Sequence, residues 1–319
     1  YKIEEVESEG AVGSLNTIIQ LIPAKRKSIR FELEAVSKSN DFIGPNLTAT
    51  FQNKNFLGGA ELFELNLTGG FETQFSQRSD TVSFNSYELG VETNLYIPRF
   101  VTPFKIRNTS SYFVPKTRFK LAYRRLNRVS FFKLNNFNAA VGYLWNETPS
   151  KRHELNLIDV SLFTLSNTTP LFERKRERST FLQQSFEERF ILSTNYSFTY
   201  NKPQKEESSD GFYFNGVADI SGNLMHLVQS ALNDREATME DPYTILGTAY
   251  SQYSRLLFDT RYYYRIDQNN EVAFRLFTGV GIPYGNSTTL PFTKQFFIGG
   301  TNSIRAFPAR SLGPGTFDP

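Results

Sequence analysis

The sequence predicts an all-β protein, and more narrowly a transmembrane antiparallel β-barrel. Three observations predict it. Long stretches of the chain alternate between apolar and polar residues, which is the periodicity of a strand. Aromatic residues make up 15% of the 319 residues, so most of the chain is expected to be ordered. Tight turns and long loops alternate between the predicted strands, as they do in membrane barrels.

Composition excludes several classes of protein. The chain has no Cys, which excludes disulfides, a thiol nucleophile and Cys-ligated zinc. His153 and His226 are its two histidines, too few for a multi-histidine metal site. The net charge of +3 comes from 35 basic and 32 acidic residues, a balance that argues against a nucleic-acid partner. We therefore expect no metal, no cofactor and no nucleic acid.

The alternation separates an apolar stripe from a polar stripe in each strand. In 271–282, for example, Val272, Phe274 and Leu276 alternate with Ala273, Arg275 and glycines. A soluble sandwich with its apolar face inward also fits this pattern. The length of the strands and the many Gly, Tyr and Phe residues on the polar stripes favour the barrel, whose apolar stripes face lipid. A mean hydropathy of −0.39 does not argue against a barrel, because the two stripes average out.

We expect about eleven strands along the chain. They are predicted at 28–38, 45–56, 59–74, 86–98, 116–127, 133–146, 152–165, 190–201, 211–224, 244–266 and 271–285. The links at 55–59, 146–151 and 267–270 have turn chemistry, and those at 167–189 and 225–243 are long. If the first strand runs outward, both long links are extracellular and the three tight turns are periplasmic.

Two segments depart from the strand pattern. Charged and apolar residues alternate irregularly over 170–188, which predicts a helix or loop over the barrel mouth. Residues 1–27 contain a single predicted strand at 16–21, followed by Pro23 and the basic cluster Lys25–Lys27. We interpret 1–27 as the remnant of an upstream domain and 28–319 as the barrel. The basic cluster suits a membrane interface.

The most specific motif lies near the C-terminal end of the chain. It comprises Gly299, Gly300, Ser303, Ile304, Arg305 and Phe307, followed by Leu312, Gly313 and Pro314. It resembles the sixth extracellular loop of the BamA/TamA superfamily of outer-membrane assembly factors, with Ala306 where that family usually has Gly. A similar likeness to this family's first periplasmic turn is found at 55–61. The general character of the chain is similar to the TamA-like TamL branch of Bacteroidota.

The resemblance implies an architecture and a set of roles. It implies a barrel of about sixteen strands, of which about eleven are present here, preceded by the last strand of a POTRA-type domain. The loop is expected to enter the lumen, where Arg305 pairs with acidic residues of later strands that this sequence does not contain. The first barrel strand, with Ile29, Phe31, Leu33 and Ala35, is expected to form a lateral gate with the last strand.

The resemblance also implies a function and partners. The expected function is insertion or assembly of other proteins in the bacterial outer membrane, as an integral membrane protein and not as an enzyme. The expected partners are outer-membrane lipid and lipopolysaccharide, unfolded β-barrel clients, and periplasmic or lipoprotein accessory subunits. A secretion or lipid-transport-linked pore of the same superfamily is the alternative. A diffusion porin is disfavoured because a loop in the lumen would obstruct it, and a hydrolase because the chain has no G-x-S-x-G motif.

Overall fold

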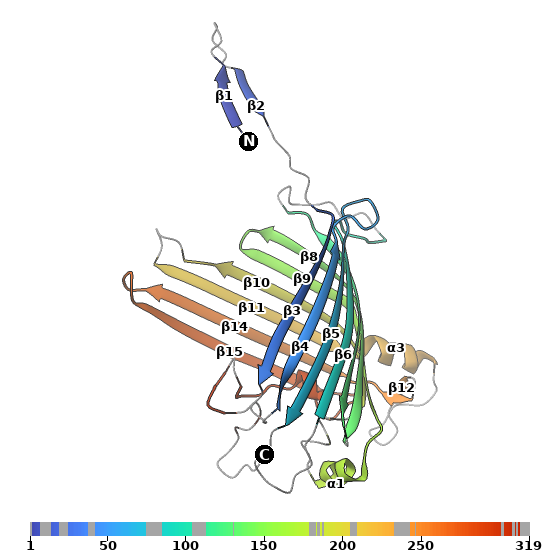
Figure 1. Ribbon diagram of the computed structural model, residues 1–319. Coiled ribbons are helices and arrows are strands. Elements are labelled where there is room, and N and C mark those ends of the chain that lie inside the picture. Colours follow the sequence, from blue (N-terminus) through green and yellow to red (C-terminus); the bar gives the residue numbers. More distant parts are fainter. Residues whose placement is uncertain are drawn as a thin grey trace.

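Eleven antiparallel strands form one curved sheet in the computed structural model (Figure 1). The structure describes residues 2–6, 14–18, 25–37, 42–74, 85–103, 113–129, 131–178, 183, 186, 188–204, 209–232, 243–245, 247–300, 303–307, 310 and 312. The strands of the sheet are β3 (Lys27–Ser37), β4 (Phe42–Asn53), β5 (Leu62–Gln74), β6 (Asn85–Ile97), β7 (Lys116–Arg128), β8 (Phe132–Thr148), β9 (Lys151–Ser166), β10 (Arg189–Lys202), β11 (Asp210–Ser221), β14 (Tyr253–Arg265) and β15 (Glu271–Pro283). Each strand pairs with its neighbour in the chain, so β3 and β15 are the two edges.

The number of sheet strands agrees with the prediction, and their bounds differ by a few residues. The largest difference is at 244–266, which was predicted as one strand. The sheet strand β14 begins at Tyr253, and the residues before it form a separate hairpin of β12 (Thr244–Ile245) and β13 (Thr248–Ala249). The segment 170–188, predicted as a helix or loop, contains helix α1 (Pro170–Arg178).

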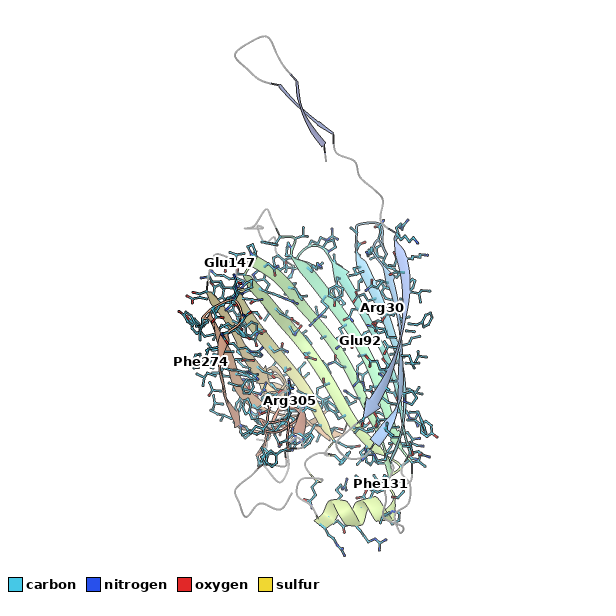
Figure 2. All side chains as sticks on the ribbon, turned by 60° about the vertical axis from the view of Figure 1, so that its left-hand side comes forward. Arg30, Glu92, Phe131, Glu147, Phe274 and Arg305 are labelled. Atoms are coloured by element: carbon cyan, nitrogen blue, oxygen red, sulfur yellow. The ribbon has the colours of Figure 1, made fainter. Side chains whose placement is uncertain are left out.

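The two faces of the sheet differ in polarity as the alternation predicted. Large apolar side chains on one face are exposed, including Phe31 (72%), Leu89 (65%) and Leu276 (65%). The other face carries charged and amide side chains, and it lies on the inner side of the curve. Figure 2 shows Phe274 pointing away from the curved sheet. No second sheet covers the exposed apolar face in the described residues, so the sandwich interpretation is wrong. Within those residues no helix is both long and apolar enough to cross a membrane.

The turn between β4 and β5 is organised by one acidic side chain. The Glu61 carboxylate accepts a hydrogen bond from the backbone N–H of Gly59 at 2.9 Å, and Asn55 Oδ1 accepts one from the N–H of Ala60. Ala60 has a φ of +64°, which is tolerated in such a short, hydrogen-bonded turn. Backbone hydrogen bonds, the first from Glu61 itself and the next from Gly59, lower the pKa of Glu61. This turn fixes the register of β4 against β5.

A segment between β11 and β14 folds over the outer side of the sheet, which the sequence did not predict. Helix α3 (Asn223–Leu232) follows β11, and β12 and β13 come next. Tyr243, Tyr250 and Phe190 form a buried cluster, against which Met225 packs. Phe190 pairs with Leu162 of β9 and belongs to the outward face of β10. The segment therefore covers apolar wall side chains that would otherwise be exposed.

The N-terminal residues form a hairpin instead of a single strand. β1 (Lys2–Val6) pairs with β2 (Ser14–Ile18) in antiparallel register, from Lys2 opposite Ile18 to Val6 opposite Ser14. The strand predicted at 16–21 corresponds in its described half to β2, its second half lies outside the described residues, and the pairing strand β1 was not predicted. A hairpin satisfies its inner backbone groups locally, which a lone strand cannot do.

Candidate functional site

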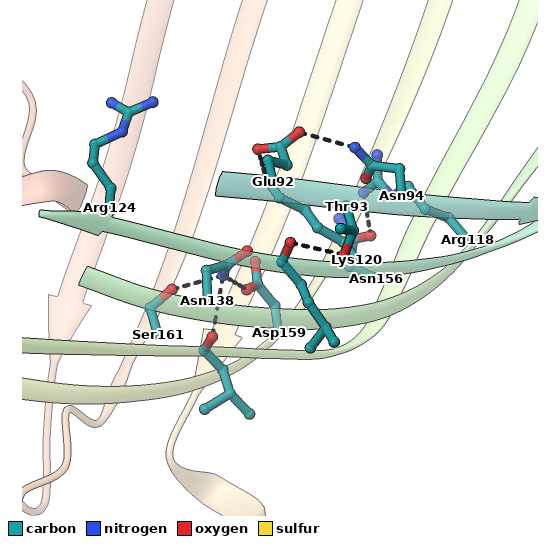
Figure 3. Close-up of polar contacts among 12 residues, drawn as sticks. Glu92, Thr93, Asn94, Arg118, Lys120, Arg124, Asn138, Asn156, Asp159 and Ser161 are labelled. Atoms are coloured by element: carbon teal, nitrogen blue, oxygen red, sulfur yellow. Dashed lines mark hydrogen bonds and ion pairs between the residues drawn. The ribbon is translucent and has the colours of Figure 1, made fainter. Parts of the chain in front are cut away.

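The inner face of the sheet is a network of cross-strand polar contacts (Figure 3). Arg118 of β7 donates hydrogen bonds to the Glu154 carboxylate at 2.8 Å and to Asn156 Oδ1 at 2.7 Å, both on β9. Glu92 of β6 forms an ion pair with Lys120 of β7 at 3.2 Å. Charges of both signs thus neutralise one another between the adjacent strands β6 and β7, and between β7 and β9 across Gly142 of β8. Such a surface suits an aqueous interior and could receive a polar loop.

The chain after β15 turns back over this inner face. Two glycines of β15 make room for it. A Cβ on Gly279 would lie 2.5 Å from the ring of Phe296, and a Cβ on Gly281 would lie 2.5 Å from Leu290 Cδ1. At Gly281 only the end of the Leu290 side chain would have to move, whereas at Gly279 the Cβ would also lie 2.9 Å from the backbone oxygen of Leu256. The glycines on the polar stripe of β15 therefore let loop side chains lie directly against the strand backbone.

Two basic side chains add specific contacts between the loop and the sheet. Lys294, at the end of the short 3-10 helix η1 (Phe292–Lys294), lies with its Nζ 2.7 Å from Oδ2 of Asp219 on β11. Asp219 is buried, with a relative exposure of 2%, and the hydroxyl of Tyr253 also donates to its Oδ2, at 3.4 Å. The guanidinium of Arg255 on β14 lies 4.7 Å from the centre of the Phe296 ring. A buried carboxylate is stable only when it is paired, so this ion pair fixes the loop at one position.

The Gly-Gly motif forms a compact hairpin at the end of the described loop. The N–H of Gly300 donates to the carbonyl of Phe307 at 2.8 Å, and the N–H of Arg310 to that of Ile298 at 2.9 Å. Gly299 and Gly300 have φ values of +96° and +88°, which explains why the motif needs glycine there. Ala306 is not among the described residues with positive φ, so a Cβ is tolerated at the position where the resembled family has Gly.

The predicted motif residues lie at different places in this hairpin. Gly299 is buried, Gly300 and Leu312 are half-buried, and the tip residues Ser303, Ile304, Arg305 and Phe307 are exposed. Figure 2 labels Arg305 on the side that the curved sheet encloses. Gly313 and Pro314 lie outside the described residues. Among the predicted motif residues, the structure therefore brings together Gly299, Gly300 and the backbone of the tip, and it leaves the side chains of the tip exposed.

A second arginine of the loop, Arg310, was not singled out from the sequence. Its guanidinium donates to the carbonyl of Phe292 at 2.6 Å and to Oε1 of Gln295 at 3.0 Å. The same group lies 3.7 Å from the centre of the Phe292 ring and 4.7 Å from that of Phe297. Burial lowers the pKa of Arg310. Its position two residues before Leu312 is the only signal in the sequence, so its role could not be distinguished from that of Arg305, the other basic residue of the motif.

A groove of about 640 Å³ lies between the hairpin and the inner face of β14 and β15. Arg255, Arg275, Phe277, Phe296 and Ile304 are among the residues that line it. Arg275 forms an ion pair with Asp259 of β14 at 2.9 Å. In the described part of the chain, no group of three His, Asp or Glu side chains could hold a metal ion. The arrangement is one of packing and charge pairing.

The predicted gate strand forms one edge of the sheet. Ile29, Phe31 and Leu33 of β3 point to the apolar side and are 65–75% exposed, and Ala35 lies on the same side and is also exposed. β3 pairs with β4 alone among the described strands, and Ile29 lies opposite Phe51 in that pairing. Within the described residues, the other edge of β3 has no strand partner.

These features define a class of protein: a membrane barrel wall with an apolar outside, a charged inside and a loop bound to the inner face. The chain matches the Omp85 superfamily domain over residues 55–318, and it belongs to that superfamily. Its sheet is part of a transmembrane β-barrel that is not closed within this chain. The superfamily is associated with protein assembly and secretion at the outer membrane.

Many solved structures are similar to this chain, and BamA is among them. The crystal structure of BamA from Haemophilus ducreyi lacking POTRA domains 1–3 superposes with a TM-score of 0.58 at 14% sequence identity. The likeness covers 98% of this chain and 52% of that one, so the chain spans about half the length of its relative. No curated protein matches the sequence.

Proposed function

We propose that this chain is the N-terminal part of the barrel of an outer-membrane protein insertion factor, integral to the bacterial outer membrane. The observation that carries the proposal is the hairpin 298–310. In a member of the Omp85 superfamily, this motif-bearing hairpin belongs to a loop that packs on the charged inner face of β14 and β15. A loop held there would obstruct an open channel, and it would support the barrel wall from the inside.

The proposed mechanism is strand addition at a lateral gate. β3 is the gate strand, and Ile29, Phe31, Leu33 and Ala35 face the lipid beside it. A client strand pairs with the free edge of β3 through backbone hydrogen bonds, which is β-augmentation. Burial of the client's apolar stripe in lipid and completion of its backbone hydrogen bonds drive the insertion, and no chemical step is needed.

The loop motif has a proposed role in keeping this wall rigid. Arg305 at the tip of the hairpin is proposed to pair with acidic side chains on the inner wall of strands beyond this chain. A guanidinium in a barrel interior is stabilised best by a bidentate carboxylate. Ser303, Ile304 and Phe307 flank Arg305 at the tip, and Leu312, Gly313 and Pro314 are proposed as further residues of the same motif.

The proposed partners follow from this role. They are unfolded β-barrel clients at β3, lipid and lipopolysaccharide around the belt, and periplasmic or lipoprotein accessory subunits. Residues 1–27 are proposed as the remnant of a POTRA-type domain and 28–319 as barrel. The TamL branch of Bacteroidota remains a prediction, because neither the superfamily match nor the BamA structure distinguishes the branches.

A secretion or lipid-transport-linked pore is the second candidate function. The observation that favours it is that the same superfamily and the same charged interior would serve a conduit. The two functions differ in what accumulates when the protein is depleted. Loss of an insertion factor lowers the amounts of many folded barrels, whereas loss of a dedicated pore affects one exported substrate.

The experiment combines depletion with charge reversal at Arg305. Depletion is expected to lower the level of folded outer-membrane barrels, and Arg305→Glu is expected to fail to restore it. Exposed Arg174 of helix α1 gives the matched control, since Arg174→Glu should restore those levels fully. Heat-modifiability on gels reports whether each variant is itself folded. If Arg305→Glu leaves both heat-modifiability and client levels unchanged, the lumen-pairing role is wrong.

A further inference from the structure

Helix α3 lies against the outside of the barrel wall. It begins directly after β11, and Gly222 (φ +81°) makes the turn that redirects the chain. On the wall side, Met225 packs on the cluster of Phe190, Tyr243 and Tyr250. The backbone N–H of Ser251 donates to the carbonyl of Phe190 at 2.9 Å, which ties the end of this segment to β10. The helix therefore stands where lipid would otherwise meet β9 and β10.

The side of α3 that faces away from the wall is apolar. Leu224, Leu227 and Val228 are 61%, 67% and 45% exposed. Their spacing of three and four residues places them on one face of the helix. The sequence of α3, NLMHLVQSAL, contains no Lys, Arg, Asp or Glu. A helix on a protein surface in water normally turns charged residues outward, whereas α3 has none and exposes Leu224, Leu227 and Val228.

The apolar face of α3 continues the apolar belt of the sheet. Ile220, three residues before the helix, is an outward residue of β11 and is 47% exposed. In the sheet register Ile220 lies opposite Ser254, which lies opposite Ile282, and Ile282 is 57% exposed. The belt thus reaches the end of these strands at the level where α3 begins. The belt of a transmembrane barrel contacts lipid. An apolar surface that continues this belt is therefore expected to contact lipid as well.

We propose that α3 is an interfacial membrane helix, with Leu224, Leu227 and Val228 in contact with lipid acyl chains at the rim of the barrel. The helix lies along the interface and shields the ends of β9 and β10, and its cluster of tyrosines sits at the level of the head groups. The proposal rests on the membrane barrel and does not depend on the proposed assembly activity.

Tryptophan fluorescence in brominated lipid tests the proposal. This chain has one tryptophan, Trp145, so Trp145→Phe gives a silent background. In that background the full-length protein receives Leu227→Trp and is reconstituted in vesicles of phosphatidylcholine brominated on its acyl chains. The matched positive control is Leu276→Trp on the belt of β15, and the negative control is Arg174→Trp on α1. Leu224→Trp gives a second reading from the same face of α3.

The expected result is that brominated lipid quenches Leu227→Trp to the same extent as Leu276→Trp, and leaves Arg174→Trp bright. Heat-modifiability of each variant establishes that the barrel is folded before its spectrum is read. Quenching of Leu227→Trp by aqueous iodide instead of lipid would overturn the proposal, because α3 would then lie in water. Protection of both α3 positions from lipid and iodide alike would also overturn it, in favour of a protein partner or a second copy.

Discussion

At the scale of single residues, the ion pair between Asp219 and Lys294 does most to define the path of the loop. The carboxylate is 2% exposed and the two charges are 2.7 Å apart, so neither can be removed without leaving the other uncompensated. The sequence could not show this pair. Asp219 is one of many polar residues on an inner stripe, and Lys294 becomes its partner only through the course of the loop over the sheet.

Removal of Lys294 is predicted to destabilise the barrel. Lys294→Ala should lower the free energy of unfolding by about 3 kcal/mol, because Asp219 would stay buried without a counter-charge. Asp219→Asn combined with Lys294→Ala should recover part of that loss. Urea titration of the protein in lipid vesicles measures both values. Lys151→Ala is the control, since Lys151 and Glu147 form an exposed pair whose loss should cost below about 1 kcal/mol. Equal effects of Lys294→Ala and Lys151→Ala would contradict the anchoring role.

At the scale of elements, the alternation of polarity was sufficient to predict the eleven sheet strands. It was not sufficient to predict α3, β12 and β13, which lie outside the sheet. The segment 244–252 was merged with the following strand, whereas in the structure Ile245 and Tyr250 pack with Phe190 on the outer wall. Helix α3 was missed because its first two residues were assigned to the strand predicted at 211–224 and the rest to the long link at 225–243.

In the loop motif, too, some features could be predicted from the sequence and others could not. The resemblance singled out Gly299 and Gly300, and their positive φ angles give the physical reason. It gave no indication of Arg310, whose partners Phe292 and Gln295 come together only when the loop folds back. Local backbone requirements can be inferred from a motif, whereas contacts within an irregular loop depend on its three-dimensional path.

The fit between the loop and β15 predicts the effect of filling a glycine. Gly279→Val should displace Phe296 and destabilise the barrel by about 1–3 kcal/mol, the usual cost of overpacking. Limited proteolysis should then cleave the loop faster. Phe296→Ala in the same protein should restore part of the protection by removing the collision with the ring, while the close approach to the backbone oxygen of Leu256 at 2.9 Å remains. Gly69→Ala on β5 is the matched control, because its added Cβ would meet nothing within 4 Å. If Gly279→Val leaves proteolysis of the loop unchanged, the loop does not rest on β15.

At the scale of the whole molecule, a single sheet with an apolar outside and a charged inside has two edges, β3 and β15. The loop packs at the β15 end of the sheet, where it contacts β11, β14 and β15. β3 lies at the other end of the strand order and carries the most exposed apolar side chains of the described residues, up to 75% at Leu33. Within the described residues both edges lack a further strand partner, and they differ in that the loop packs beside β15 whereas β3 carries the most exposed apolar side chains.

This asymmetry predicts where a client binds. A photoreactive phenylalanine analogue at Phe31 of β3 should capture an unfolded barrel client during insertion, because a strand that adds to this edge lies beside residue 31. The matched control is the same analogue at Leu89 of β6, which is 65% exposed on the same face but lies within the sheet. Cross-linked client should appear at Phe31 and not at Leu89, as measured by immunoblotting after illumination. Equal yields at both positions would mean that clients touch the apolar belt at random, and the gate at β3 would have to be given up.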